Sequence, residues 1–405
     1  MTSNIKLFLQ NTNRIDYINY LILLYAFLLP LSLDGLRAIA IVLLIFWISD
    51  KDIFTTSIPK VLKIFLIFIA FSFISYIWSD ATFQEVFKYI KRYWYFFPSF
   101  LIFKYIKQEY IKYSISAFLL GMLISEIVSY SVFFQFIPPL GHATISDPSP
   151  FMQHTMYSVF LATTSIFLLG RFLYEEEIKY KLIYLIFFLS VSVNLFIGSG
   201  RTGQIAFFGA LVVLFIYKYK LTIKTIFLSL ISIVFIFYTA YNLSPNFKNR
   251  MHHIQNDVNG MISKNNYRSS IGIRIGFWII TKEMFLENPI LGVGTANHLN
   301  MMKETVDKEL QYLHGNKRFV HFHNQYWEIL AQLGIVGLFL FLFFIYSIIK
   351  IKIIDHEIEL LKIGLISTFI LGLFADNLLW LNMSIMLFSF IVGILLAQNK
   401  YETNI

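Results

Sequence analysis

Long apolar stretches recur along the chain and restrict its possible folds more than any other feature. Twelve are long enough, or nearly so, to cross a bilayer, the shortest being 36–49 and 203–217. With 57% apolar and 14% charged residues, the chain holds more apolar surface than a soluble globule can bury. No alternating pattern of the kind found in membrane β-barrels runs through the stretches. The sequence therefore predicts an all-α polytopic membrane protein with about 12 transmembrane helices, at 17–32, 36–49, 61–78, 89–105, 112–137, 155–173, 182–198, 203–217, 225–242, 325–349, 360–379 and 383–398.

The distribution of Lys and Arg orients these spans. If the N-terminus is cytoplasmic, the cytoplasmic connections carry basic clusters, whereas the opposite loop at 138–154 and the turn at 380–382 carry none. This alternation predicts that both termini are cytoplasmic. It also accounts for the formal charge of +9 without a nucleic-acid partner. The basic residues that break the pattern on the outer side are Arg37, Lys88, Lys91, Arg92 and Arg201.

One connection on the outer side is much longer than the others and predicts a small subdomain. It contains a helix-like stretch at 271–286 that stops at Asn288-Pro289. The chain has no cysteine, which excludes disulfides, thiol nucleophiles and cysteine-bound metals. The N-terminus lacks the pattern of a cleaved signal peptide, so we expect the first span to be retained. The predicted division is 1–242 with transmembrane helices 1–9, 243–324 as the periplasmic loop subdomain, and 325–405 with transmembrane helices 10–12.

Histidine is unevenly distributed, because eight of the nine residues fall on the predicted outer side. His321 and His323 stand where the long loop enters the next span. A histidine at this position can act as a general base, since its ordinary pKa lies near neutrality. The alternative is an interfacial histidine beside an aromatic belt. A metal site built from this pair and Glu328 is disfavoured, because no carboxylate cluster completes it.

Arginines on the outer side form a second group of candidates. Arg201 lies in a glycine-rich turn, where a close backbone approach and a bidentate guanidinium would suit a phosphate, although a plain turn explains the pattern equally well. Arg274 is one turn into the predicted outer helix and shares a face with Trp278, over which its guanidinium can lie. Lys91 and Arg92 are weaker candidates, which could contact an anionic lipid headgroup.

Two other features suggest different functions. Asp50-Lys51-Asp52 resembles a metal-nucleotide motif, but the predicted topology places it in the cytoplasm, far from the histidines. Glu126 is a carboxylate near the middle of a span, which is typical of an ion path in a transporter or flippase. A relay needs several such groups, so a single one supports that function only weakly.

Three ordered blocks resemble the shared region of the O-antigen ligase and polymerase superfamily. Together they span roughly 190–345, and the remaining spans match only in number and hydropathy. The blocks are Gly198-Ser199-Gly200-Arg201-Thr202-Gly203, then Arg274-Ile275-Gly276-Phe277-Trp278 with Glu287-Asn288-Pro289-Ile290-Leu291-Gly292-Val293-Gly294, and finally His321-Phe322-His323-Asn324-Gln325-Tyr326-Trp327-Glu328-Ile329-Leu330 with Leu333-Gly334-Ile335-Val336-Gly337.

The resemblance implies a glycosyltransferase of the bacterial inner membrane whose active site faces the periplasm. Its donor would be a glycan on undecaprenyl diphosphate and its acceptor lipid A–core, with no nucleic acid, metal or other cofactor. Matched residue by residue, Arg201 and Arg274 would hold the diphosphate and His323 would deprotonate the acceptor hydroxyl. His321 is less securely matched, and it joins Lys91 and Arg92 as a candidate for substrate binding. Direct displacement by one base would invert the anomeric centre.

The resemblance leaves the acceptor open. A polymerase would use a second lipid-linked repeat unit, and a third branch of the superfamily uses a protein hydroxyl. We favour the ligase on the modest loop length and the spelling of the blocks. A transporter or flippase is the alternative that is not an enzyme, and it would move its substrate without forming a glycosidic bond.

Overall fold

The described part of the chain is mostly helical and contains no β-strand. The computed structural model describes residues 13–50, 57–264, 267–301 and 321–403. Its helices are α2 (Arg14–Leu28), α3 (Leu33–Ile48), α4 (Lys60–Ile74), α5 (Phe83–Ile90), α6 (Pro98–Tyr105), α7 (Gln108–Phe133), α8 (His154–Tyr174), α9 (Ile178–Ile197), α10 (Arg201–Tyr219), α11 (Ile223–Leu243), α12 (Pro245–Lys264), α13 (Ser270–Glu287), α14 (His298–Met301), α15 (Gln325–Ile349), α16 (His356–Gly372) and α17 (Asn382–Thr403), with 3-10 turns η1 (Ser75–Trp78) and η2 (Lys91–Phe96).

These helices confirm the predicted all-α membrane fold. Within the described residues, eight helical segments are long and apolar enough to cross a membrane. The number twelve stays a prediction, because several predicted spans are shorter or broken. The run at 89–105 divides into the end of α5, the turn η2 and helix α6, which starts at Pro98. Proline has no N–H to donate to the preceding turn, so it favours the first position of a new helix.

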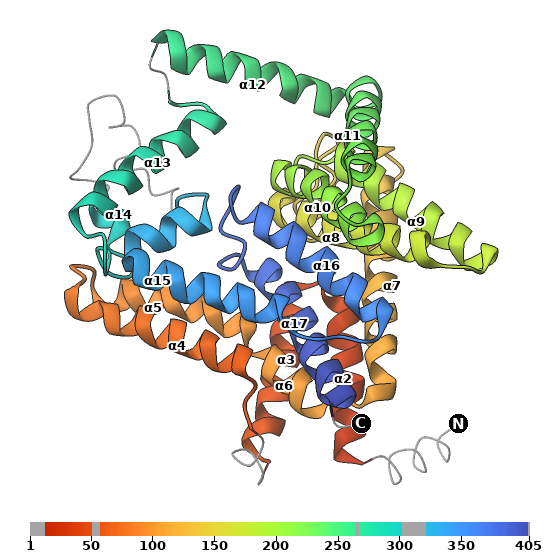
Figure 1. Cartoon of the computed structure of the whole chain (residues 1–405), viewed down its shortest axis with the longest axis horizontal. Coiled ribbons are helices and arrows are strands. Elements are labelled where there is room, and N and C mark those ends of the chain that lie inside the picture. The colour runs from red at the N-terminus through yellow and green to blue at the C-terminus, as the bar shows by residue number, and fades with distance from the viewer. Residues whose placement is uncertain (1–12, 51–56, 265–266, 302–320, 404–405) are drawn as a thin grey trace.

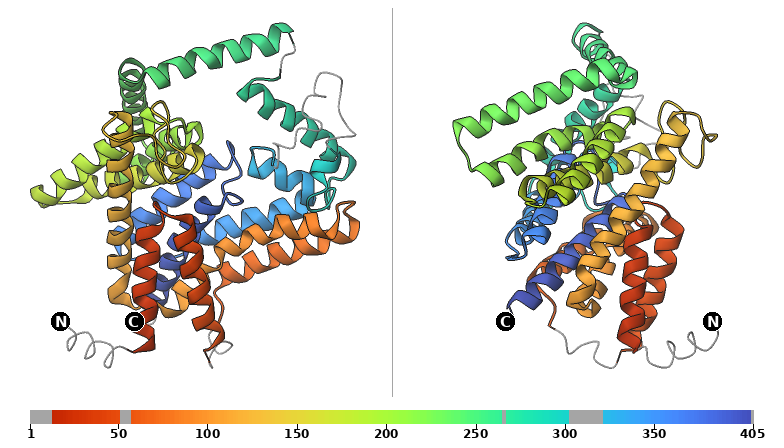
Figure 2. Two further views of the ribbon diagram at one scale, coloured as in Figure 1. Left: turned by 180° about the vertical axis from the view of Figure 1, so that it is seen from behind. Right: turned by 90° about the vertical axis from the view of Figure 1, so that its right-hand side faces the viewer.

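The first and last described helices meet at one end of the molecule (Figure 1). Lys107 pairs with Asp16 at the start of α2, and the Tyr401 hydroxyl near the end of α17 donates to the Ile106 carbonyl at 2.7 Å. Two ends on one side agree with an even number of crossings. Helix α12 lies at the opposite end and runs across the top of the bundle in two views (Figures 1 and 2).

Burial separates central helices from peripheral ones. In the most apolar window of each helix, 89% of α17 and 83% of α8 is buried, against 17% of α11. Helix α17 contacts α6, α7, α8 and α16, and α15 lies along α4. Helices α8 and α17 therefore form the centre of the bundle, and α11 leaves most of its apolar surface to lipid.

The long segment that begins at 243 is helical at both α12 and α13. Helix α13 covers the stretch predicted at 271–286 and ends just before Pro289, as expected, whereas α12 was not predicted. The turn after α13 is bonded to the backbone of α15. The N–H of Val293 donates to the carbonyl of Ala331 at 2.9 Å, and the N–H of Gly294 donates to that of Gln332 at 2.8 Å. The segment is thus fastened to the first part of α15.

A break in α15 makes this attachment possible. Gly334 adopts φ 61°, which interrupts the helix and leaves the carbonyls of the preceding turn open to other donors. A Cβ on Gly334 would stand 2.3 Å from the Ile290 carbonyl oxygen, and one on Gly292 would stand 2.5 Å from the Gly334 nitrogen. Gly292 and Gly334 therefore allow the backbone after α13 to pass close to the backbone of α15.

Candidate functional site

The segment before α15 holds the two predicted histidines in a fixed loop. His323 has φ 52°, an uncommon conformation for a residue with a side chain. The loop persists because Asn324 caps α15, accepting from the N–H groups of Tyr326 and Trp327 at 3.1 Å each. The Asn324 amide also donates to the Phe374 carbonyl at 3.0 Å. The loop is thereby tied to the connection between α16 and α17.

That connection supplies a carboxylate, Asp376, that belongs to none of the predicted site residues. Asp376 Oδ1 lies 3.3 Å from Nδ1 of His323 and 3.7 Å from Nδ1 of His321. Asp376 is buried, whereas the His323 side chain is 31% exposed. The carboxylate of Asp376 therefore lies beside the Nδ1 edge of the His323 ring, while part of the His323 side chain is open to solvent. The signal in the sequence was a carboxylate inside the apolar run 360–379, which is costly in a membrane unless it is used.

A second buried carboxylate, that of Glu328, is hydrogen-bonded to the backbone of the loop that carries His321 and His323. Glu328 is fully buried and accepts from the Phe322 N–H and the Tyr89 hydroxyl, both at 2.6 Å. His298 is also fully buried, with Nε2 3.8 Å from Glu328. Glu328 therefore does not join His321 and His323 as a third possible metal ligand. His321, His323 and Asp376 are the described residues that could hold a metal, with ligand atoms within 4.8 Å of one another.

The structure brings Arg274 to the same place. Its Nε donates to the Ala375 carbonyl, next to Asp376, at 3.3 Å. Burial lowers the pKa of Arg274, an effect that Asp376 opposes and that the nearby positive charge of Arg201 reinforces. Stacking of its guanidinium on Trp278 stays a prediction. Arg274 thus lies close enough to both Asp376 and Arg201 for their charges to act on it.

Arg201 begins α10, and the glycines around it have a packing role. A Cβ on Gly200 would stand 2.2 Å from Ser158, and one on Gly203 would stand 2.1 Å from the Ser158 carbonyl oxygen. The Gly203 N–H donates to Oγ of Ser158 at 3.1 Å. These glycines therefore allow α8 and α10 to approach closely, which differs from the interpretation that they let the backbone approach a phosphate.

The turn before Arg201 is bonded to the loop 138–154, which is predicted to lie on the outer side. Asp147 accepts from the Ser199 N–H at 2.9 Å and from Nδ1 of His154 at 3.0 Å. Burial opposes ionisation of this carboxyl, yet these hydrogen bonds keep the pKa of Asp147 below its usual range. Arg250, on α12, donates to the Gly198 carbonyl at 3.0 Å. Neither Asp147 nor Arg250 was predicted, although Arg250 is another cation on the predicted outer side.

Arg92 and Lys91 have different surroundings. The Arg92 guanidinium lies over the Trp380 ring, 4.6 Å from its centroid, and that ring contacts His321 at a centroid distance of 5.5 Å. Arg92 therefore reaches the histidine loop through one aromatic side chain, whereas Lys91 is exposed.

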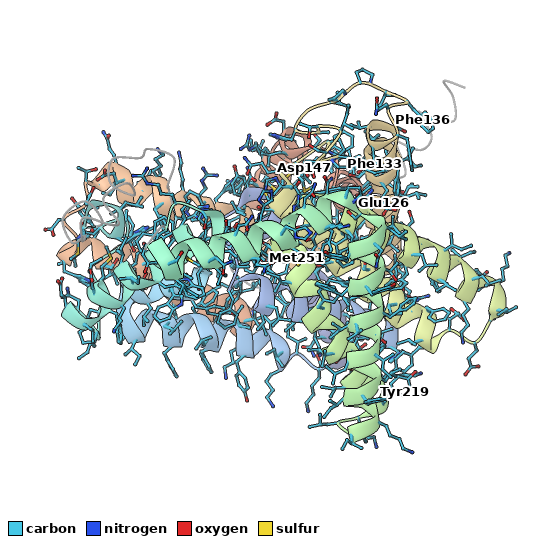
Figure 3. The ribbon with its side chains drawn as sticks, turned by 90° about the horizontal axis from the view of Figure 1, so that it is seen from above. Glu126, Phe133, Phe136, Asp147, Tyr219 and Met251 are labelled. Carbon is cyan, nitrogen blue, oxygen red and sulfur yellow. The ribbon has the colours of Figure 1, made fainter. Side chains whose placement is uncertain are left out.

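The two carboxylate features that suggested other functions lie elsewhere. Glu126 is buried on α7 and accepts from Ser190 at 3.3 Å (Figure 3).

Asp50 pairs with Lys104 at 2.8 Å, which gives it a structural role. The other two members of that motif, Lys51 and Asp52, lie outside the described residues, as does His314 of the outer histidines. Asp50 follows the end of α3, and its partners Lys104 and Tyr105 both belong to α6.

The free energy of unfolding is expected to fall as the pH is lowered from about 6.5 towards 4. Burial lowers the pKa of His321 to about 4 and that of His298 to about 3. In this window both histidines bind more protons in the unfolded chain than in the folded chain, so their protonation by acid favours unfolding. Thermal unfolding of the purified protein in detergent at a series of pH values measures this dependence. His298→Phe removes one of the groups and should flatten the curve; an unchanged slope would contradict the assignment.

Comparison with known proteins agrees with the geometry. Residues 185–342 match the family model described as O-Antigen ligase, which confirms the superfamily resemblance. The matched range contains Arg201, Arg274 and His323. A protein of Haemophilus influenzae, named only as uncharacterized, is 28% identical over 247 residues. That match covers 60% of this chain and 60% of the relative, so the chain aligns with less than two thirds of the relative's length.

Proposed function

We propose that this chain, whose residues 185–342 match the O-antigen ligase family, transfers a glycan from undecaprenyl diphosphate to lipid A–core at the periplasmic face. The observation that carries the proposal is the meeting of His323 with Asp376 beside the arginine pair Arg201 and Arg274. A partly exposed base next to partly buried cations suits a reaction in which a hydroxyl attacks and an anion leaves.

The proposed reaction uses these groups in one displacement. The acceptor hydroxyl transfers its proton to His323 while its oxygen forms a bond to the anomeric carbon. The bond from that carbon to the diphosphate breaks, and its electron pair stays on the phosphate oxygen. Arg201 and Arg274 stabilise the negative charge that develops there. Attack opposite the leaving group inverts the anomeric centre, and the arginines supply the charge compensation that a metal would otherwise supply.

Asp376 and Glu328 act in this proposal through the histidine loop. Asp376 holds Nδ1 of His323, which leaves the other ring nitrogen for the acceptor proton. Glu328 fixes the backbone at Phe322, so the loop keeps the uncommon conformation of His323. The acceptor then approaches on the side of the loop where His323 is exposed. Arg92, packed on Trp380, is a candidate contact for a phosphate of the acceptor lipid.

The acceptor is tested with purified protein, a glycan on undecaprenyl diphosphate and separate candidate acceptors. We expect mass analysis to show glycan joined to lipid A–core in the presence of a chelator. Glycan joined only to a second lipid-linked repeat unit would indicate a polymerase, and glycan joined only to a protein hydroxyl would indicate the third branch. Product that forms only with added divalent metal would contradict the metal-free reaction.

Replacement of Arg201 or Arg274 with alanine is expected to reduce kcat about 10²–10³-fold, as for the loss of one group that stabilises developing charge. The reason is that the diphosphate leaving group gains charge as the glycosidic bond breaks. Steady-state kinetics with the lipid-linked donor measures the loss. Lys88→Ala removes an exposed cation of the same outer side as a control. Equal activity of the Arg274→Ala and Lys88→Ala proteins would remove Arg274 from the mechanism.

A further inference from the structure

Arg250 contacts the turn that precedes Arg201, although it belongs neither to the three sequence blocks nor to the predicted site residues. It sits on the second turn of α12 and is partly buried. Its Nη1 donates to the Gly198 carbonyl at 3.0 Å, three residues before Arg201. The same turn that presents Arg201 therefore also receives Arg250.

Other contacts fix α12 against this turn. The Asn246 amide donates to the Ile197 carbonyl at 3.0 Å and to the Ser146 carbonyl at 2.6 Å. Asp147, the next residue of that outer loop, accepts from Ser199. Figure 3 shows Asp147 beside α12, which is marked by Met251, at this end of the molecule. The position of Arg250 relative to Arg201 is thus determined by hydrogen bonds on both sides of the turn.

The charges gathered here are incompletely balanced. Burial and the positive charge of Arg201 lower the pKa of Arg250, and Arg201 also acts on Arg274 in the same direction. The opposing carboxylates are already engaged, Asp147 with His154 and Asp376 with His323. The N-terminus of α10, whose N-cap residue Gly200 has no side chain to cap it, adds a partial positive charge at Arg201. Arg250 and Arg274 are partly buried and each is repelled by Arg201, so the three guanidinium groups favour an anion with more than one charge.

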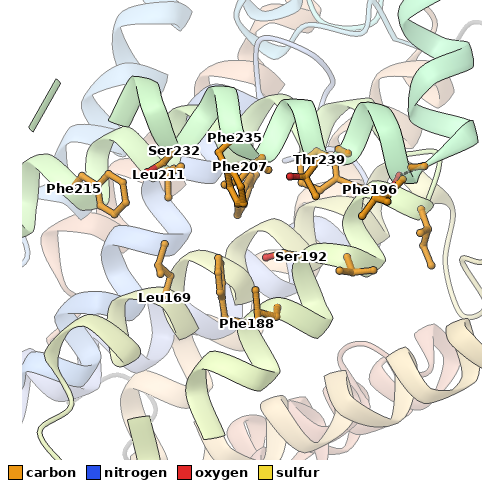
Figure 4. Close-up of a pocket in the computed structure, with 17 residues that line it drawn as sticks. Leu169, Phe188, Ser192, Phe196, Phe207, Leu211, Phe215, Ser232, Phe235 and Thr239 are labelled. Atoms are coloured by element: carbon orange, nitrogen blue, oxygen red, sulfur yellow. Dashed lines mark hydrogen bonds between the residues drawn. The ribbon is translucent and has the colours of Figure 1, made fainter. Parts of the chain in front are cut away.

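An apolar cavity next to this turn indicates the kind of molecule that carries the anion. It has a volume of about 400 Å³ and lies between α9, α10 and α11 (Figure 4). Its lining includes Phe196 and Ile197, which directly precede Gly198, and Ser244, which directly precedes α12. A hydrocarbon chain in the cavity would leave its polar end beside Arg250 and Arg201. This arrangement favours an anion attached to a lipid over a free phosphate.

We propose that Arg250 is a third binding residue for the diphosphate of the lipid-linked donor, acting with Arg201 and Arg274. This inference rests on the proposed function for the identity of the donor. Arg201 belongs to a membrane helix, whereas Arg250 and Arg274 belong to two helices of the long outer segment. Binding of one diphosphate therefore connects α12 and α13 to α10, so donor binding and the arrangement of the outer helices are coupled.

Two substitutions separate this role from a structural one. Arg250→Gln keeps a donor for the Gly198 carbonyl but removes the charge, whereas Arg250→Lys keeps the charge. Lys248→Gln is the matched control, since Lys248 is exposed on the same helix. The probes are undecaprenyl diphosphate, undecaprenol and inorganic pyrophosphate, each tested for binding to the full-length protein in detergent, with the thermal midpoint recorded for every variant.

Arg250→Gln is expected to weaken binding of undecaprenyl diphosphate about tenfold or more, the effect of one lost charge-assisted hydrogen bond. Arg250→Lys should recover part of that affinity, and undecaprenol should bind all variants equally. Inorganic pyrophosphate should show the same order of variants at lower affinity. Unchanged binding by Arg250→Gln, or equal losses in the Gln and Lys variants with a lowered thermal midpoint, would overturn the proposal. If Arg250→Gln loses diphosphate binding but the unsubstituted protein transfers glycan to no acceptor, the binding role of Arg250 stands and only the proposed function is refuted.

Discussion

Replacement of His323 with alanine is expected to reduce glycan transfer about 10²–10⁴-fold, the usual contribution of a general base. The physical reason is that the acceptor hydroxyl is a poor nucleophile until its proton is removed. The loss should appear in kcat, while the KM for the lipid-linked donor changes little, because the arginines that bind the diphosphate remain. Steady-state kinetics on protein purified in detergent measures both values.

Two comparisons test the specificity of this result. His142→Ala removes an exposed histidine of the outer loop 138–154 and should leave transfer unchanged. Added imidazole should restore part of the activity of His323→Ala, since it supplies a base to the space that the side chain left. Full transfer by His323→Ala with no imidazole present would exclude this residue as the base.

Replacement of Asp376 with asparagine is expected to reduce kcat by as much as about 10⁴-fold, the effect seen when the carboxylate that orients a catalytic histidine is lost. Asparagine has nearly the shape of aspartate, so the change removes charge without opening a cavity. The negative charge stabilises the protonated ring that forms during the reaction, and it holds Nδ1 of His323 at 3.3 Å. The donor KM should stay near the wild-type value.

A purely structural role for Asp376 would give a different pattern. It would lower the thermal midpoint and raise the donor KM together with the fall in kcat. Combining Asp376→Asn with His323→Ala provides a second test, because an orienting residue has little effect once the base is absent. Additive losses in the double variant would show that Asp376 acts independently of His323.

The fold class could be predicted because hydropathy and length decide it locally. Each predicted run coincides with helical structure, although two are not single long helices. The run at 89–105 is divided because Pro98 starts a new helix, and the run at 360–379 ends its helix at Gly372. Apolar composition cannot predict where a helix is interrupted, since the residues on both sides of the interruption remain in an apolar environment.

The candidate site was partly predictable. Arg201, Arg274 and His323 were selected from motifs, and the structure brings Arg274 near both other elements of the site. The glycines beside Arg201 were assigned to phosphate approach, whereas they pack α10 against α8 at Ser158. Spacing alone cannot separate these roles, because any close approach of a backbone selects the same small residue.

The sequence by itself determined that this chain is a helical membrane protein, since the hydrophobic effect and backbone hydrogen bonding leave few other structures for such apolar runs. It also carries the resemblance to the superfamily, through blocks whose order is a local property of the chain and whose range the family model matches. Only the tertiary structure decided which charges share the site. Asp376 meets His323, Arg250 reaches the turn before Arg201, and Asp147 closes that turn, each across at least 50 residues of sequence. Electrostatic interactions depend on distance in space, and helix packing sets that distance.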